Sequence, residues 1–421
     1  MSYPANNPIT YTAIAQAAGA PSDTFSYAWS FDDGTTGTGA SLAHTWSVTG
    51  TRSATVTATD NMTGLTATAT KAVSIVNWST LTWTSTAQKI IPTATASISN
   101  DPVFSAFRLL KSGNLLINAI DVSNQATIVV YNTSSGLRSE YINVTSTVGN
   151  ILCAIVLTAG SNAGNVLVVG QGNGKYGFFN PNTGVFTVSG NTIPVSVFGN
   201  ATIRSSMTVL GNGKILMLDT SGFSALLYNQ ATDSWSTATN ATQNYLQDLF
   251  TLPSGNAIAI DDGNASTYIY NQTTNTWSAG PTLPNTVTAD NYAIGQMANG
   301  SIFTIKTGST CPAYIWTEGS PSFAAMATNY PYASQDSGAT TTNFQQVIPT
   351  SDGNVVTVGG AVGGGGGKDT KSIVYYAPTD SWVVSAPLLA TGVAYRGAQL
   401  NGKLWRCGST GVLEYMPLVT T

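Results

Sequence analysis

A turn made of a polar residue, a glycine and a second polar residue recurs seven times, and it constrains the fold more than any other feature. Each copy lies between two apolar segments, and two further segments follow before the next copy. A unit of this kind cannot bury its apolar face alone, so neighbouring copies have to stack. The repeat therefore predicts seven similar four-stranded sheets. The turn glycines lie 42 to 53 residues apart and are Gly113, Gly164, Gly213, Gly255, Gly300, Gly353 and Gly402.

The residues around each turn favour antiparallel strands. Ser-Gly and Asn-Gly tolerate the positive φ that tight hairpins need, and the segments that follow, such as LLINAI and VLVVG, are apolar and rich in β-branched residues. The fourth segments carry Trp235, Trp277 and Trp382. The third segments end in an aromatic residue, usually before Asn: Tyr131, Phe179, Tyr228 and Tyr270, with Trp316, Tyr376 and Tyr415 at the matching places.

The last copy lacks a fourth segment, and an orphan segment of that character, 77–83 (NWSTLTW), precedes the first copy. Pairing the two would remove two exposed sheet edges. Over residues 77–421 the chain resembles the kelch family. Kelch repeats are about 50 residues long, and Gly359-Gly360 and the tryptophan positions match their motif. This resemblance implies a seven-bladed β-propeller that is closed by an N-terminal strand.

Residues 1–76 do not share the repeat. They contain Tyr27-Ala28-Trp29-Ser30-Phe31-Asp32-Asp33-Gly34, then His44-Thr45-Trp46 and an alternating Thr/Val strand. This segment resembles a PKD domain, an immunoglobulin-like β-sandwich, although Asp32, Trp46 and Arg52 replace the usual Gly, Tyr and Tyr. We expect Trp29 to fill the core, Asp33-Gly34 to shape a turn and His44 to form a hydrogen bond rather than bind a ligand. The whole chain is therefore predicted to be all-β.

Charge excludes several partners. Only 8% of the residues are charged, against roughly 25% in an average globular protein, and the net charge is −4. Nucleic-acid binding needs clustered Lys and Arg, which 15 basic residues in 421 do not supply. No leader-like or membrane-spanning apolar run is found, so we expect no membrane insertion.

A single histidine, His44, excludes much of the catalytic chemistry found on such folds. Copper radical oxidases resembling galactose oxidase need two histidines, and Ser–His–Asp hydrolysis needs an imidazole beside the nucleophile. No Cys/His cluster has zinc-ligand spacing. We therefore predict a protein that is not an enzyme and that uses no cofactor and no metal.

A sialidase-like anion site is the hardest catalytic alternative to exclude. Arginines stand near the starts of three first segments. First strands of a propeller would line its axis and their starts would open on one face, although coincidence also explains the placement. Tyr245, Asp248, Asp290 and Tyr292 precede first segments on the same face. Lys368 and Lys371 follow the glycine run 363–367, which reads as a hairpin loop. The predicted ligand-binding residues are Arg108, Arg204, Arg396, Tyr245, Tyr292 and Lys368.

These observations lead to a ranked set of functions. The first is a virion surface protein of a bacteriophage, a decoration, tail or fibre component in a multimeric assembly. Its partners would be other virion proteins and host surface glycans, because Trp and Tyr stack on sugar faces. The alternative is an extracellular or cell-surface bacterial adhesin or polysaccharide-binding protein. A sialidase-like glycosidase comes third.

Overall fold

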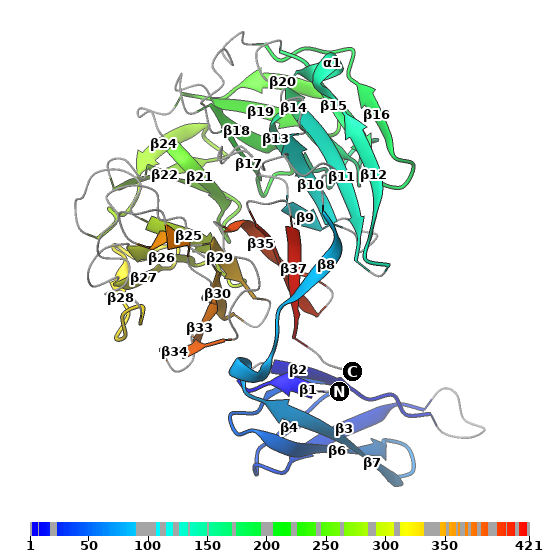
Figure 1. The fold of residues 1–421 in the computed structure, drawn as a ribbon. Coiled ribbons are helices and arrows are strands. Elements are labelled where there is room, and N and C mark those ends of the chain that lie inside the picture. The colour runs from blue at the N-terminus through cyan, green and yellow to red at the C-terminus, as the bar shows by residue number, and fades with distance from the viewer. Residues whose placement is uncertain are drawn as a thin grey trace.

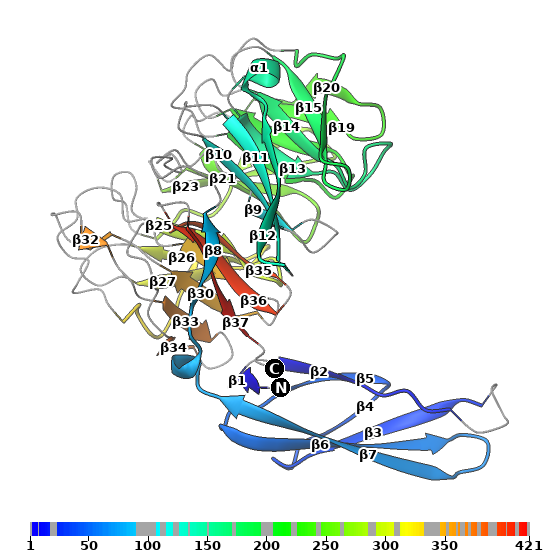
Figure 2. The same cartoon turned by 45° about the vertical axis from the view of Figure 1, so that its right-hand side comes forward.

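The computed structural model describes most of the chain in 24 separate ranges (Figures 1 and 2). They are residues 2–6, 8–16, 23–89, 107–109, 115–120, 126–133, 135–149, 151–170, 174–194, 205–219, 225–240, 246–261, 265–284, 292–306, 312–331, 346–350, 353–358, 361–362, 367–368, 372–376, 380–385, 394–400, 402–408 and 412–418. Within them the chain is all-β apart from two single turns, η1 (Trp78–Thr80) and α1 (Thr145–Val148). In these ranges no helix has the length and apolar content needed to cross a membrane.

The N-terminal module is a sandwich of two sheets, which are antiparallel except that β1 pairs with β7 in parallel. One has the order β1-β7-β6-β3-β4 and the other pairs β2 with β5. The predicted core residue Trp29 is buried between them, and its indole Nε1 donates to the carbonyl oxygen of Gly39 at 2.8 Å. The strands are β1 (Ser2–Pro4), β2 (Pro8–Thr12), β3 (Phe25–Phe31), β4 (Thr36–Thr38), β5 (Ser41–Thr45), β6 (Gly50–Asp60) and β7 (Thr66–Val76).

Seven four-stranded sheets follow within the described residues, and we number them one to seven in chain order. Sheet one contains β9 (Phe107–Leu109), β10 (Leu115–Ile120), β11 (Ala126–Asn132) and β12 (Leu137–Asn143). Sheet two contains β13 (Ile151–Val156), β14 (Val166–Gly170), β15 (Tyr176–Asn180) and β16 (Val185–Val188). Sheet three contains β17 (Ser205–Val209), β18 (Ile215–Asp219), β19 (Ala225–Asn229) and β20 (Ser234–Thr237).

Sheet four contains β21 (Leu246–Thr251), β22 (Ala257–Asp261), β23 (Ser266–Asn271) and β24 (Thr276–Ala279). Sheet five contains β25 (Tyr292–Gln296), β26 (Ile302–Lys306), β27 (Ala313–Trp316) and β28 (Ala324–Ala325). Sheet six contains β29 (Gln346–Pro349), β30 (Val355–Val358), β33 (Ser372–Tyr376) and β34 (Ser381–Val384). Sheet seven contains β35 (Ala394–Leu400), β36 (Lys403–Gly408), β37 (Val412–Pro417) and β8 (Thr84–Lys89). A short pair, β31 (Ala361–Val362) and β32 (Gly367–Lys368), flanks part of the glycine run, whose residues 363–366 lie outside the described ranges.

The glycine turns behave as the repeat predicts. Six of the seven turn glycines have φ between 69° and 89°, where a side chain would be strained, and Gly113 lies outside the described residues. The predicted Trp positions are also confirmed, because the indoles of β20, β24 and β34 pair in register with third-strand tyrosines. These pairs are Tyr228 with Trp235, Tyr270 with Trp277 and Tyr375 with Trp382.

Two of the predicted matching aromatics are wrong by one residue. In sheet six the register places Tyr375, not Tyr376, opposite Val355, and in sheet seven it places Met416, not Tyr415, opposite Leu404. Spacing alone missed this because strand lengths differ between copies. Tyr376 faces the other side of its sheet, toward the N-terminal module.

The orphan segment 77–83 is not the strand that pairs with the last sheet, so this expectation is corrected. Residues 78–80 form the turn η1, and the strand that pairs with β37 is β8, where Thr84 lies opposite Tyr415. The side chains of Trp78, Leu81 and Trp83 are all buried in one cluster. A strand alternates its faces, so it could not direct residues 78, 81 and 83 into the same core.

Apolar clusters fill the space between consecutive sheets. They join sheet one to two, two to three, three to four, four to five, five to six and six to seven. Tyr131 of sheet one and Trp405 of sheet seven also touch, with ring centroids 5.7 Å apart. First strands of neighbouring sheets meet as well, for instance β13 with β17, β25 with β29 and β35 with β9.

Two polar ties, which sequence reasoning missed, also recur between neighbouring sheets. In the first, a residue with φ of 45–56° before the fourth strand accepts a hydrogen bond from its own third-strand tyrosine and another from the preceding sheet. In the second, a residue after the third strand accepts a backbone N–H from the preceding sheet. The first set is Asp233, Asn275 and Asp380, and the second is Gln230, Gln272 and Glu318.

Candidate functional site

The predicted anion-binding face lies where first strands begin and second strands end. Arg108 and Arg396 lie within β9 and β35, two first strands in contact, and Tyr292 begins β25. Lys368 lies in β32. For these four residues the structure gives the backbone position. Arg204, Tyr245, Asp290 and Lys371 lie outside the described residues.

Carboxylates occupy the same end of sheet four. Asp261 ends β22 and is fully buried, and Asp248 is half-buried beside Ile260, next to a register shift in β21. Sequence reasoning named Asp248 and missed Asp261, although the apolar run AIAI that leads into an acidic pair was a usable signal. Negative charge at this end weakens the attraction that the face could exert on an anion.

A buried ion pair lies in sheet seven near Arg396. Nε of Arg406 donates to Oε2 of Glu414 at 2.6 Å, and both side chains are almost completely shielded from solvent. The two residues face each other across β36 and β37, and Arg406 also lies opposite Gly397 of β35. Sequence reasoning did not single out this pair. Because the two charges neutralise each other, the pair is a structural feature rather than an anion site.

None of the nine tryptophans is exposed. Trp235, Trp277 and Trp382 are half-buried at the fourth strands, and Trp277 donates from Nε1 to the carbonyl oxygen of Thr239 at 2.8 Å. The other six are buried: Trp29, Trp46, Trp78, Trp83, Trp316 and Trp405. Six tryptophans therefore serve packing alone, and the three at the fourth strands keep only part of their ring surface in contact with solvent.

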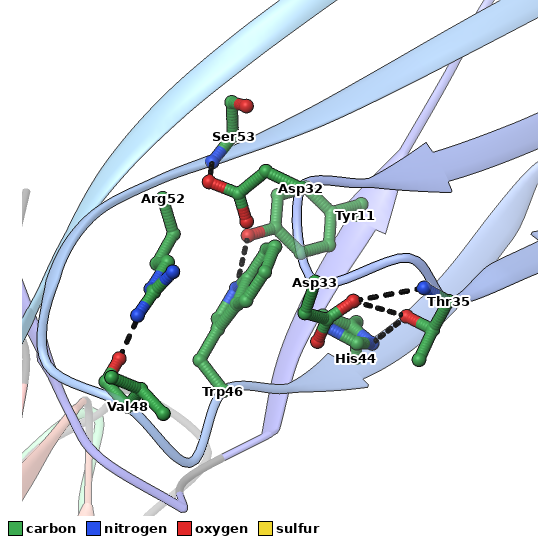
Figure 3. A network of polar contacts seen from close by, with 9 residues as sticks. All are labelled: Tyr11, Asp32, Asp33, Thr35, His44, Trp46, Val48, Arg52 and Ser53. Atoms are coloured by element: carbon green, nitrogen blue, oxygen red, sulfur yellow. Dashed lines mark hydrogen bonds and ion pairs between the residues drawn. The ribbon is translucent and has the colours of Figure 1, made fainter.

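The polar network of the N-terminal module centres on Asp33 (Figure 3). Nε2 of His44 lies 2.9 Å from Oδ2 of Asp33, and the hydroxyl and N–H of Thr35 donate to Oδ1 at 2.7 and 3.0 Å. His44 stacks on Phe31 with centroids 3.8 Å apart. Partial burial by itself raises the pKa of Asp33, but the Thr35 hydrogen bonds and His44 hold that pKa below its usual value.

This network holds a turn, as predicted for Asp33-Gly34 and His44. Gly34 follows with φ of 87°, and its N–H donates to the carbonyl oxygen of Phe31. Nearby, Trp46 donates to the hydroxyl of Tyr11 and the N–H of Ser53 to Asp32, as Figure 3 shows. Within the part of the chain that the structure describes, no three His, Cys, Asp or Glu side chains gather in a way that could hold a metal ion.

The junction between the module and the sheets is held by hydrogen bonds to the backbone of the N-terminal segment and by an apolar anchor. The carbonyl oxygen of Ala5 accepts two hydrogen bonds, from Nε1 of Trp78 at 3.1 Å and from the hydroxyl of Tyr376 at 2.8 Å. Asn354 donates to the carbonyl oxygen of Asn6 at 3.4 Å. Trp78 belongs to the apolar cluster between sheets six and seven, so the linker is anchored in the core.

These features define the class of protein: an all-β chain with an N-terminal immunoglobulin-like module and a series of blade-like four-stranded sheets. Comparison with known proteins supports both parts. Residues 3–75 match the PKD domain family, which confirms the predicted resemblance of the module. No curated protein matches the chain by sequence.

Solved structures similar to the chain have β-propeller-like folds. A catalytically inactive virginiamycin B lyase from Staphylococcus aureus with quinupristin has 9% identity and a TM-score of 0.58, covering 80% of this chain and 100% of its own. A streptogramin B lyase has 11% identity and a TM-score of 0.57, covering 80% and 98%. YCF48 bound to D1 peptide has 12% identity and a TM-score of 0.54, covering 80% and 94%. At these identities the similarity concerns the fold alone.

Proposed function

We propose that this chain is a non-enzymatic virion surface protein of a bacteriophage, a decoration, tail or fibre component that attaches to a host or its glycans. The observation that carries the proposal is a PKD module packed firmly onto blade-like sheets in a chain with only 8% charged residues. Such a chain relies on Ser, Thr, Asn and Gly for solubility. The module would anchor, and the sheets would present loops.

We also infer the finer architecture. The seven sheets form seven blades of a kelch-type propeller, with residues 1–76 as one domain and 77–421 as the other, and β8 closes the ring. Three observations support this: β8 pairs with β37, β9 contacts β35, and Tyr131 touches Trp405 across sheets one and seven.

The similar structures include both an enzyme and a peptide-bound protein, so the fold by itself does not decide between catalysis and binding. The similar lyase is described as catalytically inactive when one histidine is replaced by alanine. The only histidine of this chain is His44, which lies in the PKD module and is engaged with Asp33. This supports a function without lyase chemistry.

Glycan attachment would rest mainly on side chains other than Trp, because six of the nine tryptophans are buried and the other three are partly buried. Tyr245 and Tyr292 would stack on sugar rings, and Arg108, Arg204, Arg396 and Lys368 would bind acidic groups. A glycan array probed with the full chain tests this set. Binding to acidic glycans that Arg396→Ala abolishes is expected, and equal binding by the variant would contradict the assignment.

Purified virions provide the main test. An antibody against the full chain should label particles after lysis, and peptides of the chain should copurify with capsid or tail proteins. Detection of the chain in secreted fractions of bacteria that release no virus would favour the alternative, an extracellular or cell-surface adhesin or polysaccharide-binding protein. A gene neighbourhood of capsid and tail genes, as opposed to secretion genes, separates the two independently.

The sialidase-like glycosidase is kept as the third candidate. Its support is the placement of Arg108 and Arg396 on neighbouring first strands. Hydrolysis of acidic glycans by the full chain, lost in Arg204→Ala and Arg396→Ala, would favour it. No hydrolysis by the unaltered chain would exclude it.

A further inference from the structure

The outer edge of β7 is a long strand edge that no other strand of the described residues covers beyond its last three positions. In the described residues β7 pairs with β6 along its length, but with β1 only at Ser74, Ile75 and Val76. Residues 66–72 are all exposed. The register with β6 has no bulge and the segment (TATATKA) has no proline, so two of the usual devices that protect sheet edges are missing.

The backbone groups that point out of this edge can be assigned. The N–H of Ala5 donates to the carbonyl oxygen of Val76, so Val76 faces the β1 side, whereas the carbonyl oxygen of Leu65 accepts from Asp60 on the β6 side. Successive residues of a strand alternate in direction. The residues whose N–H and C=O face outward are therefore Thr66, Thr68, Thr70 and Ala72.

We propose that this edge binds the same edge of a second copy of this chain, as an antiparallel β7–β7 pair around a two-fold axis at Ala69. Such a pair is self-complementary, as a two-fold interface requires. Thr68 then lies opposite Thr70 of the other copy, and Thr66 opposite Ala72. All outward-facing groups of one copy meet outward-facing groups of the other.

The length of the free segment of β7 favours a second copy of this chain as the partner. The free segment is bounded by the hairpin turn at Leu65 on one side and by β1, which begins opposite Ser74, on the other. With the axis at Ala69, each hairpin turn arrives where the other copy's β1 begins. A longer strand from another protein would meet β1 at one end, or would extend past the hairpin turn at the other, where β7 offers it no partner.

The proposed register also places the charged and the large apolar side chains of the edge opposite suitable residues of the other copy. Lys71, the one charged residue of the segment, lies opposite Ala67 of the other copy, so the two lysines do not face each other. The hairpin exposes two large apolar side chains, Met62 (78% exposed) and Leu65 (73% exposed). The pairing places Leu65 opposite the other copy's Val73, which is apolar and buried.

The module can meet a second copy without interference from the sheets that follow it. The β6–β7 hairpin projects away from them, whereas the β1 end of the module lies against them (Figure 2). The resulting dimer would carry two sets of blade-like sheets and would raise the avidity of any surface attachment. The inference does not depend on which target the sheets bind.

Sedimentation velocity of the full chain tests the pair. Thr68→Pro removes an outward N–H without touching the β6 ladder and should raise the dimer dissociation constant by about tenfold or more. Ala67→Lys places like charges opposite each other and should weaken the dimer, and Ala67→Glu, opposite Lys71, should strengthen it. Unchanged circular dichroism and melting temperature show that the variants fold.

The register is tested by cross-linking. Ala69→Cys faces its own copy across the axis and should form a covalent dimer on mild oxidation, whereas Ala67→Cys, which faces Lys71, should not. A chain that stays monomeric at all accessible concentrations would overturn the proposal, and so would a dimer that none of these variants changes. A dimer cross-linked equally by both cysteines would overturn the register.

Discussion

Trp78 donates a hydrogen bond from its indole Nε1 to the carbonyl oxygen of Ala5, 73 residues earlier in the chain. The same oxygen accepts the hydroxyl of Tyr376. The N-terminal module is therefore joined to the sheets by buried polar contacts and by an apolar anchor, and not by a loose linker. Because Ala5 and Trp78 are both buried, breaking this contact would take from the indole N–H the acceptor that it has in the folded chain.

Trp78→Phe should cost more stability than Trp83→Phe, although both residues belong to the same apolar cluster. Trp83 is a matched control because its Nε1 has no hydrogen-bond partner within the described residues. Both changes remove similar ring area, so the difference of about 1 kcal/mol reports the hydrogen bond to Ala5. Urea unfolding of the full chain measures it, and equal losses would argue against a stabilising role for that bond.

Asp233 ties sheets two and three together. Two replacements of it should show whether its negative charge or its hydrogen-bond geometry stabilises the fold. Its Oδ1 accepts the hydroxyls of Tyr176 at 2.7 Å and Tyr228 at 2.9 Å, and its φ is 47°. Asp233→Ala loses both bonds and strains the left-handed backbone, so about 2–4 kcal/mol of stability should be lost.

Asp233→Asn is the control for that change. Asn275 holds the equivalent place in sheet four, with φ of 56°, and accepts the hydroxyl of Tyr270 at 2.8 Å. The amide should therefore preserve most of the stability, as measured by thermal unfolding. Equal destabilisation by Asn and Ala would mean that the negative charge, and not the geometry, is essential at this position.

The sequence predicts the repeating part of the fold well because glycine turns and apolar alternation are local properties. Gly213 and Gly255 have the positive φ that their Asn-Gly and Ser-Gly contexts imply, and Trp235 and Trp277 pair with tyrosines as their spacing suggests. The prediction that residues 77–83 form the closing strand was wrong because the tryptophans of this segment look like those of a fourth strand. Trp78 instead contacts Ala5 and Tyr376, and no local pattern contains these contacts.

The candidate site was less accessible to sequence reasoning. Arg108 and Arg396 do lie on neighbouring strands, as their place in the repeat predicts. Asp261 and the Arg406–Glu414 pair went unnoticed, because burial of a charged side chain depends on which strand lies opposite. The burial of the tryptophans was equally hard to predict, because an indole at a fourth strand packs in part against the neighbouring sheet.

Alkaline solution should loosen the ties between sheets. Burial, together with Asp233, raises the pKa of Tyr176 to about 12, and burial with nearby carboxylates also raises the pKa of Tyr228 and Tyr375. An unfolded tyrosine titrates near ~10, so the unfolded chain loses its protons first. The stabilisation is therefore complete below pH ~10 and is lost as the pH rises through the folded values.

Phenolate absorbance and circular dichroism, followed together during titration with base, test this. Ionisation of these tyrosines should coincide with unfolding above pH ~10, and Tyr176→Phe should reduce the loss of stability in that window. Full ionisation of all tyrosines in a chain that remains folded would contradict the raised pKa values.

Replacing one residue of the buried Arg406–Glu414 pair should lower the stability of the fold much more than replacing both. Arg406→Met alone leaves the Glu414 carboxylate in a site shielded from solvent and should cost about 3–5 kcal/mol, or force that carboxyl to take up a proton. Replacing both residues by Met removes the stranded charge as well, so most of that loss should be recovered. Urea unfolding of the two single variants and the double variant forms a double-mutant cycle that measures the coupling. If the double variant lost as much stability as the two single variants lose together, the charges would not act as a pair. The stability of sheet seven would then have to come from its packing against Tyr131 and Tyr376 instead.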